Sequence, residues 1–132
     1  MQRPRVLVVD DDDGTLQAIA AVLRRDFAVW VARDATHAIA VAEELDWDAD
    51  VLIVDLLLGN GMRGDEFAAL YRTRQRRETP VLVISGAAER LELAEGIDVT
   101  AIIHKPFDFE HFARTIWMLL PPALRSRYFT NV

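Results

Sequence analysis

The sequence predicts an α/β fold, a doubly wound five-stranded parallel sheet flanked by five helices. Short apolar runs alternate with segments of helical periodicity from one end of the chain to the other. The run at residues 51–54 is apolar at every position, which is typical of a parallel strand buried on both faces. The 132 residues, 52% of them hydrophobic, are enough for one packed domain.

The first half of the chain contains three expected strands and two expected helices. Strands are predicted at residues 5–9, 27–31 and 51–54, each a short apolar run. The first expected helix has apolar residues at the i, i+3, i+4, i+7 spacing of one helix face, namely Leu16, Ile19, Ala20 and Leu23. The second expected helix carries Ala35, Ala38, Ile39, Ala42 and Leu45.

The second half begins with a glycine-rich stretch at residues 59–64 and contains two further strands and three helices. The third expected helix carries Phe67, Leu70 and Tyr71, and a strand follows at residues 81–84. A short helix is expected around residues 89–95 and the last strand at 101–103. The last helix carries Phe109, Phe112, Ile116 and Leu119, and it should end before Pro121 because proline cannot continue a helix.

No linker or internal repeat divides the chain, so we expect one domain at residues 1–120 and a C-terminal tail at 121–132, with no output domain. The net charge of −6 disfavours direct nucleic-acid binding, which needs a clustered basic face. Apolar runs are far shorter than the ~20 residues of a membrane span, so a soluble cytoplasmic protein without membrane association is expected. The chain has no cysteine, which excludes disulfides and thiolate metal sites.

Polar residues follow four of the five expected strands. They are Asp10 and Asp11 after the first strand, Asp55 after the third, Ser85 after the fourth and Lys105 after the fifth. The carboxyl ends of parallel strands meet at one edge of a sheet, where doubly wound folds bind ligands. Three carboxylates crowded together repel one another unless a cation lies among them, and a site with only oxygen ligands suits Mg²⁺, with Mn²⁺ tolerated.

Such a site is suited to phosphoryl transfer, in which the protein mainly positions the group and neutralises its charge. Asp55 would be the nucleophile that forms an acyl phosphate, while Lys105 and Ser85 would contact the transferred oxygens. Each residue alone has a simpler interpretation, since acidic residues cap helices, Asp and Ser occur in turns, and most lysines are on the surface. Their coincidence at the ends of four strands favours a functional site.

Four segments carry a family resemblance, namely residues 6–12 (VLVVDDD), 50–55 (DVLIVD) with 61–64 (GMRG), 80–86 (PVLVISG) and 104–107 (HKPF). With these segments in this order and spacing, residues 5–120 resemble the receiver domains of bacterial two-component response regulators, which have a flavodoxin-like fold. The resemblance implies that Asp10, Asp11 and Asp55 bind Mg²⁺ together with the backbone carbonyl of Leu57. No other cofactor is expected.

The resemblance also implies that Asp55 accepts a phosphoryl group from a phosphohistidine on a sensor histidine kinase or a histidine phosphotransfer protein. Ser85 and Lys105 would then contact the phosphoryl group, and Lys105–Pro106 would be a cis peptide bond. The phosphorylated domain would shift the conformation of its output face for a downstream protein target, and the family also allows a homodimer through the last helix-strand-helix face. The protein would not be an enzyme beyond catalysing its own phosphorylation and slow dephosphorylation.

Three departures from the family pattern concern signalling and the loops. Ile102 stands where family members usually have an aromatic residue, which puts the usual aromatic switch in doubt. Gly59 replaces a frequent proline in a loop about one residue longer than usual, so this loop is expected to be more mobile. The segment between Ser85 and Lys105 is about two residues shorter than usual, so its helix should be short.

Slow self-dephosphorylation is expected because Leu57 and residue 87 are apolar and cannot orient a water molecule.

Two other functions fit parts of the sequence. Residues 11–16 (DDDGTL) match the nucleophile motif of haloacid-dehalogenase-type phosphatases, in which Asp11 would be the nucleophile. That family needs a further strand ending in acidic Mg²⁺ ligands after the lysine, which this chain lacks, and the role of Asp55 would be unexplained. The second alternative is a degenerate receiver that acts only as a protein-interaction module, although every residue of the phosphorylation site is present.

Overall fold

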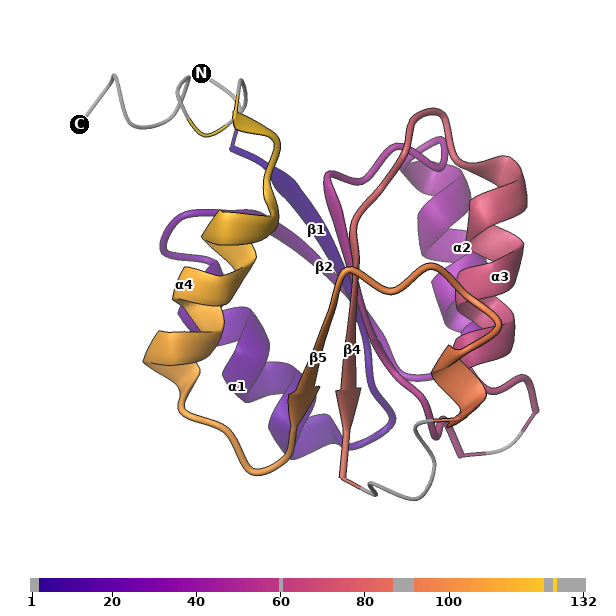
Figure 1. Cartoon of the computed structure of the whole chain (residues 1–132), viewed down its shortest axis with the longest axis horizontal. Helices are drawn as coiled ribbons and strands as arrows, with labels where there is room; N and C mark the ends of the chain where they lie inside the picture. The colour runs from indigo at the N-terminus through magenta and orange to yellow at the C-terminus, as the bar shows by residue number, and fades with distance from the viewer. Residues whose placement is uncertain (1–2, 60, 87–91, 123–124, 126–132) are drawn as a thin grey trace.

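The computed structural model describes residues 3–59, 61–86, 92–122 and 125 (Figure 1). Five parallel strands form one sheet in the order β2-β1-β3-β4-β5. The strands are β1 (Arg5–Val9), β2 (Ala28–Ala32), β3 (Val51–Asp55), β4 (Val81–Ser85) and β5 (Ala101–His104). The helices are α1 (Asp13–Leu23), α2 (Ala35–Glu44), α3 (Gly64–Arg74) and α4 (Phe109–Leu119). The predicted fold class is therefore confirmed.

Helices cover both faces of the sheet, with α1 and α4 on one side and α2 and α3 on the other (Figure 1). Alternate residues of β1 divide between two apolar cores, because successive side chains of a strand point to opposite faces. Val6 and Val8 pack with α1 and α4, whereas Leu7 and Val9 pack with α2 and α3. The central strands β3 and β4 are buried along their whole length, as the uninterrupted apolar run at residues 51–54 predicts.

The prediction of five helices needs a correction. The described residues contain four α-helices, and in the segment between β4 and β5 the only helical element among them is a 3₁₀ turn at residues 92–94. Part of the expected helix, residues 89–91, lies outside the described residues. The segment that crosses from β4 to β5 is short, and a helix of about two turns is marginal without an extensive apolar face to pack.

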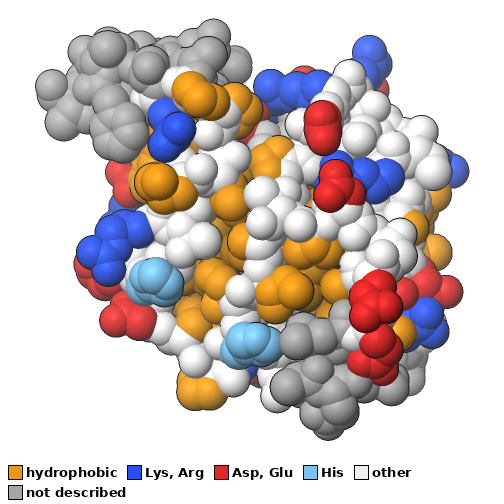
Figure 2. All heavy atoms as spheres, in the orientation of Figure 1, with side chains coloured by type: hydrophobic (Ala, Val, Ile, Leu, Met, Phe, Trp, Pro, Cys, Tyr) orange, Lys and Arg blue, Asp and Glu red, His pale blue; other side chains and the backbone are white. Residues whose placement is uncertain are grey.

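Strand β5 forms one edge of the sheet, and its side chains alternate between partly buried and exposed. Ile102, at the position of the expected aromatic residue, is 40% exposed and pairs with Val83 of β4. In the view of Figure 1, β5 lies at the front of the molecule. Figure 2 shows the same face, with hydrophobic side chains gathered near its middle. The exposed large apolar residues also include Met118 of α4. This side of the molecule therefore presents apolar surface.

The arginines at the end of α3 form ion pairs with carboxylates. Arg77 Nε lies 2.8 Å from Asp48 Oδ1, and the Arg77 guanidinium also contacts Asp50, while Arg76 contacts Asp46. These acidic residues precede β3, so the ion pairs link the α2–β3 and α3–β4 connections.

Within the described residues, no helix is long and apolar enough to cross a membrane.

Candidate functional site

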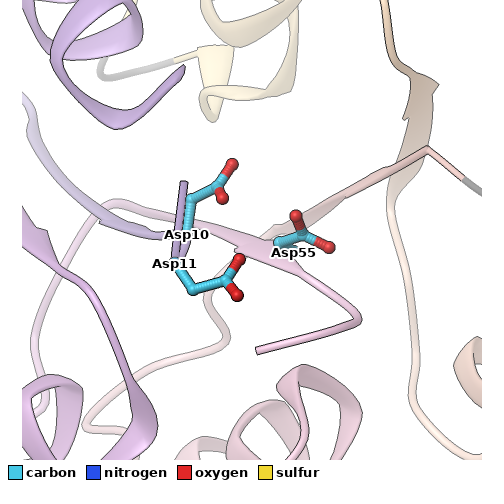
Figure 3. Close-up of side chains that lie close together, drawn as sticks. All are labelled: Asp10, Asp11 and Asp55. Carbon is cyan, nitrogen blue, oxygen red and sulfur yellow. The ribbon is translucent and has the colours of Figure 1, made fainter. Parts of the chain in front are cut away.

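The predicted site residues lie at the carboxyl edge of the sheet. Asp10 and Asp11 directly follow β1, and Asp55 is the last residue of β3. Each of these aspartates has a carboxylate oxygen within 4.8 Å of the others, and Figure 3 shows the three side chains around one common space. Ser85 ends β4, is buried, and lies one register position beyond the partner of Asp55. The strands thus bring these residues together as expected.

Lys105 connects two of the carboxylates. It follows β5, and its Nζ lies 2.8 Å from Asp55 Oδ2 and 3.0 Å from Asp10 Oδ2. Burial by itself lowers the pKa of Lys105, but the hydrogen bonds with Asp55 and Asp10 outweigh it and raise the pKa above its ordinary value. The ammonium group therefore stays charged and offsets part of the negative charge of the cluster.

Asp10 is the most deeply buried of the three carboxylates, with no exposed surface. Burial raises its pKa, and the hydrogen bonds from the Asp12 backbone and from Lys105 offset this only in part. Its Oδ1 accepts a hydrogen bond from Asp12 N at 2.9 Å. Its Oδ2 is buried and lies 3.0 Å from the Lys105 Nζ, which is its positively charged partner.

The geometry of this cluster fits a hard divalent cation. Three carboxylates face one ammonium group, so the local charge is negative even with Lys105 in place. Negative charge that is buried and only partly neutralised is costly, and a bound cation would offset it. Oxygen ligands without histidine or cysteine are those that Mg²⁺ prefers. The residues that could hold the ion are Asp10, Asp11 and Asp55.

Two backbone features of the β3–α3 loop support the site, and we did not predict them from the sequence. Leu57 N donates a hydrogen bond to Asp55 Oδ1 at 3.0 Å, which fixes that oxygen. Gly64 packs so closely against the end of β3 that an added Cβ would lie 1.8 Å from the Asp55 carbonyl oxygen. Only glycine fits there, since any side chain would displace the strand that carries Asp55. The available signal in the sequence was a glycine at the expected start of the helix that follows the loop after β3.

A recess lies beside Lys105. Its volume is about 480 Å³, and it is lined by Thr15, Gly86, Lys105, Pro106, Phe107 and Phe109. The Lys105–Pro106 peptide bond is cis, which confirms the expectation from the family resemblance. The recess therefore combines an ammonium group with aromatic and apolar walls.

The comparisons with known proteins agree with this geometry. The family model of the response regulator receiver domain matches residues 6–116. Protein PetR of Rhodobacter capsulatus is 32% identical over 111 residues, which are 81% of this chain and 44% of PetR. The transcriptional regulatory protein TcrA of Mycobacterium tuberculosis is 35% identical over 114 residues, which are 83% of this chain and 44% of TcrA.

Solved structures show the same fold. The chemotaxis protein CheY4 of Vibrio cholerae superposes with a TM-score of 0.79 at 28% sequence identity, covering 89% of this chain and 99% of CheY4. A receiver domain protein from Methanospirillum hungatei gives a TM-score of 0.76 at 22% identity, covering 87% of this chain and 91% of that structure. The chain spans less than half the length of the curated relatives named above.

Proposed function

Since the chain belongs to the response regulator receiver domain family, which acts as a signalling switch, we propose that Asp55 is its phosphoacceptor. The donor is a phosphohistidine of a histidine kinase or of a histidine phosphotransfer protein. The observation that carries the proposal is the convergence of Asp10, Asp11 and Asp55 around one space, with the Lys105 ammonium bonded to Asp55.

In the proposed reaction, a carboxylate oxygen of Asp55 attacks the phosphorus atom. The O–P bond forms while the N–P bond breaks, and the electron pair of that bond remains on the imidazole nitrogen, which takes up a proton from solvent. Bound Mg²⁺, or Mn²⁺ in its place, would neutralise charge on the transferred oxygens. Lys105 would neutralise a second oxygen and the Ser85 hydroxyl would contact a third. The Leu57 carbonyl is proposed as a further metal ligand.

The phosphoryl group is proposed to be long-lived. Leu57, two residues after Asp55, is 39% exposed and apolar, so it cannot orient an attacking water molecule by hydrogen bonding. The second residue of this argument, residue 87, lies outside the described residues. Isolated phosphoprotein should therefore lose its phosphoryl group slowly, and a half-life of seconds, followed by intact mass, would contradict the proposal.

The proposed partners follow from this chemistry. The recess beside Lys105 supports docking of the phosphohistidine-bearing protein, and a downstream protein target would respond to the phosphorylated form. Exposed apolar residues near β5 support an output face, or a homodimer, on the last helix-strand-helix face. We propose residues 1–120 as the receiver domain and 121–132 as a tail, acting in the cytoplasm without direct nucleic-acid or membrane contact.

The test is the intact mass after incubation with acetyl phosphate and Mg²⁺, with and without a chelator. Wild type should gain one phosphoryl group only when the metal is present, and Asp55→Asn should gain none. An adduct that persists in Asp55→Asn but disappears in Asp11→Asn, with turnover of a phosphoester, would indicate the dehalogenase-type chemistry instead. If acetyl phosphate and a phosphorylated kinase both give no adduct and no turnover, the chain is an interaction module.

A further inference from the structure

The backbone of the β3–α3 loop holds one of the metal-site carboxylates. Gly59 N donates a hydrogen bond to Asp11 Oδ2 at 3.0 Å. The two residues are far apart in the sequence and belong to different loops, since Asp11 lies between β1 and α1 and Gly59 lies between β3 and α3. This single hydrogen bond therefore joins the two loops that border the cluster of carboxylates.

Asp11 differs from the other two carboxylates in its surroundings. Asp10 and Asp55 are buried, and backbone N–H groups of their own loops hold one oxygen of each. Asp11 is exposed, so its side chain would otherwise be free to turn towards solvent. Among the hydrogen bonds of the described residues, the one from Gly59 is what fixes the Asp11 carboxylate next to its neighbours.

We infer that Gly59 is a positioning residue for the metal site, acting through its N–H group on Asp11. The inference rests on the proposed function, because it assumes that the three carboxylates bind Mg²⁺. A hydrogen bond from N–H to a carboxylate is charge-assisted, and partners that orient a metal ligand typically change metal affinity by about 10- to 100-fold. The feature that residue 59 must supply is a backbone N–H, which every residue except proline has.

Gly59 stands where many members of the family have proline. The family resemblance suggested that glycine in place of proline would make the loop more mobile. The structure shows in addition that Gly59 makes a contact that proline could not make. Its φ angle lies outside the left-handed region, so the conformation does not require glycine. The N–H group is therefore one feature that glycine supplies here and that proline would lack.

The chain offers a matched pair of variants. Gly59→Pro removes the N–H group, whereas Gly59→Ala keeps it. A Cβ at position 59 would lie 3.4 Å from Asp11 Oδ2, which is an ordinary contact distance, so alanine fits. The two variants thus differ mainly in the presence of the donor.

Mg²⁺ affinity is measured by titration calorimetry for wild type and both variants. Phosphorylation by acetyl phosphate is measured in parallel by intact mass, with Asp55→Asn as the negative control. We expect Gly59→Ala to bind Mg²⁺ nearly as wild type does, and Gly59→Pro to bind it about 10-fold more weakly or worse. Equal affinities of the two variants would overturn the inference and leave the proposed function intact. Wild type that neither binds Mg²⁺ nor becomes phosphorylated would overturn the proposed function, and the inference with it.

A second measurement does not depend on the folding of the proline variant. Amide hydrogen exchange of Gly59 is followed by NMR in wild type and in Asp11→Ala, with metal removed. Loss of the acceptor should speed exchange at Gly59 several-fold, while Gly64, whose N–H bonds to the Leu56 carbonyl at 2.9 Å, should be unchanged. Unchanged exchange at Gly59 would show that the hydrogen bond does not hold Asp11, and would overturn the inference.

Discussion

Replacing Asp10 with asparagine should stabilise the metal-free protein at neutral pH. Asp10 is fully buried among like charges, and asparagine keeps its size and an oxygen that can accept the hydrogen bond from Asp12 N. The substitution removes one negative charge from a cluster that has three carboxylates and one ammonium group. Its effect therefore measures what the buried charge costs when no divalent cation is bound.

The magnitude follows from the distances. Asp55 has an oxygen within 4.8 Å of one on Asp10, and at an effective dielectric constant of about 20 this repulsion is roughly 3.5 kcal/mol. Lys105 Nζ at 3.0 Å attracts Asp10 by roughly 5.5 kcal/mol on the same scale. Asp11 adds a repulsion that solvent weakens, so attraction and repulsion nearly cancel. What remains is the cost of burying the charge, and we expect a net gain on the order of 1–2 kcal/mol.

The size of the stability gain of Asp10→Asn depends on pH. Burial raises the pKa of Asp10, so protonated Asp10 favours the folded state; this contribution is complete below its ordinary pKa of 3.8 and is lost as pH rises through the raised value. As the pH rises from 3.8 through the raised pKa of Asp10, the wild type should therefore lose stability relative to Asp10→Asn. The advantage of the variant should be large at about pH 7 and small at about pH 4.

Thermal unfolding in the presence of EDTA tests this, with Asp26→Asn as a control. Asp26 is exposed, lies in the turn after α1 and has no ion pair among the described residues, so its substitution changes the net charge equally without touching the site. At neutral pH the melting temperature of Asp10→Asn should rise by roughly 3–8 °C over wild type and the control. A lower melting temperature, or a gain that does not shrink towards pH 4, would refute the reasoning. Adding Mg²⁺ should reduce the difference in melting temperature between Asp10→Asn and wild type, because the ion binds wild type more tightly and so stabilises it more than the variant.

Three further substitutions are expected to lower stability, each for a different reason. Lys105→Met should cost the metal-free protein on the order of 2 kcal/mol in urea unfolding, because it leaves the buried carboxylates unneutralised, and Mg²⁺ should restore more stability than in wild type. Gly64→Ala should cost about 2–3 kcal/mol and slow phosphorylation by acetyl phosphate, whereas Gly96→Ala, with no atom near the added Cβ, should change little. Tyr71→Phe should cost about 1–3 kcal/mol in thermal unfolding, because it leaves a buried backbone N–H without its acceptor.

The strands and the site residues were predictable from the sequence for the same physical reason. A strand buried on both faces appears as an uninterrupted apolar run, so its last residue can be located to within about one position. Asp55 and Ser85 were found because each ends such a run, and Asp10 because it directly follows one. Parallel pairing then places all these ends at one edge of the sheet, so no knowledge of distances was needed to expect a common site.

The loop contacts were not predictable in this way. The hydrogen bond between Gly59 and Asp11 depends on the conformation of two loops, and neither loop has a periodic pattern from which that conformation could be read. The close approach of Gly64 to Asp55 depends on how α3 begins over the end of β3. Among the described residues of the short helix expected before β5, only a 3₁₀ turn at residues 92–94 is formed, since so few residues gain little from helical hydrogen bonding.

The hydrogen bonds of Asp55 also predict which of its oxygens receives the phosphoryl group. Oδ1 accepts from Leu57 N at 3.0 Å, and Oδ2 accepts from Lys105 Nζ at 2.8 Å. The oxygen that bonds to phosphorus becomes a poorer acceptor, so its donor must find another partner. The Leu57 N–H is fixed by the backbone, whereas the Lys105 ammonium ends a flexible chain and can move to the phosphoryl oxygens.

We therefore expect Oδ2 to be the attacking atom. The recess beside Lys105 is on the same side of Asp55 as the ammonium group, because Lys105 contacts Oδ2 and also forms part of the recess wall. A crystal structure with beryllofluoride bound to Asp55 tests this expectation. Beryllium should bond to the carboxylate oxygen that faces Lys105, with the Leu57 N–H still bonded to the other oxygen. Beryllium on the oxygen that faces the Leu57 N–H would contradict the expectation, because the backbone N–H and not the lysine would then have lost its hydrogen bond to Asp55.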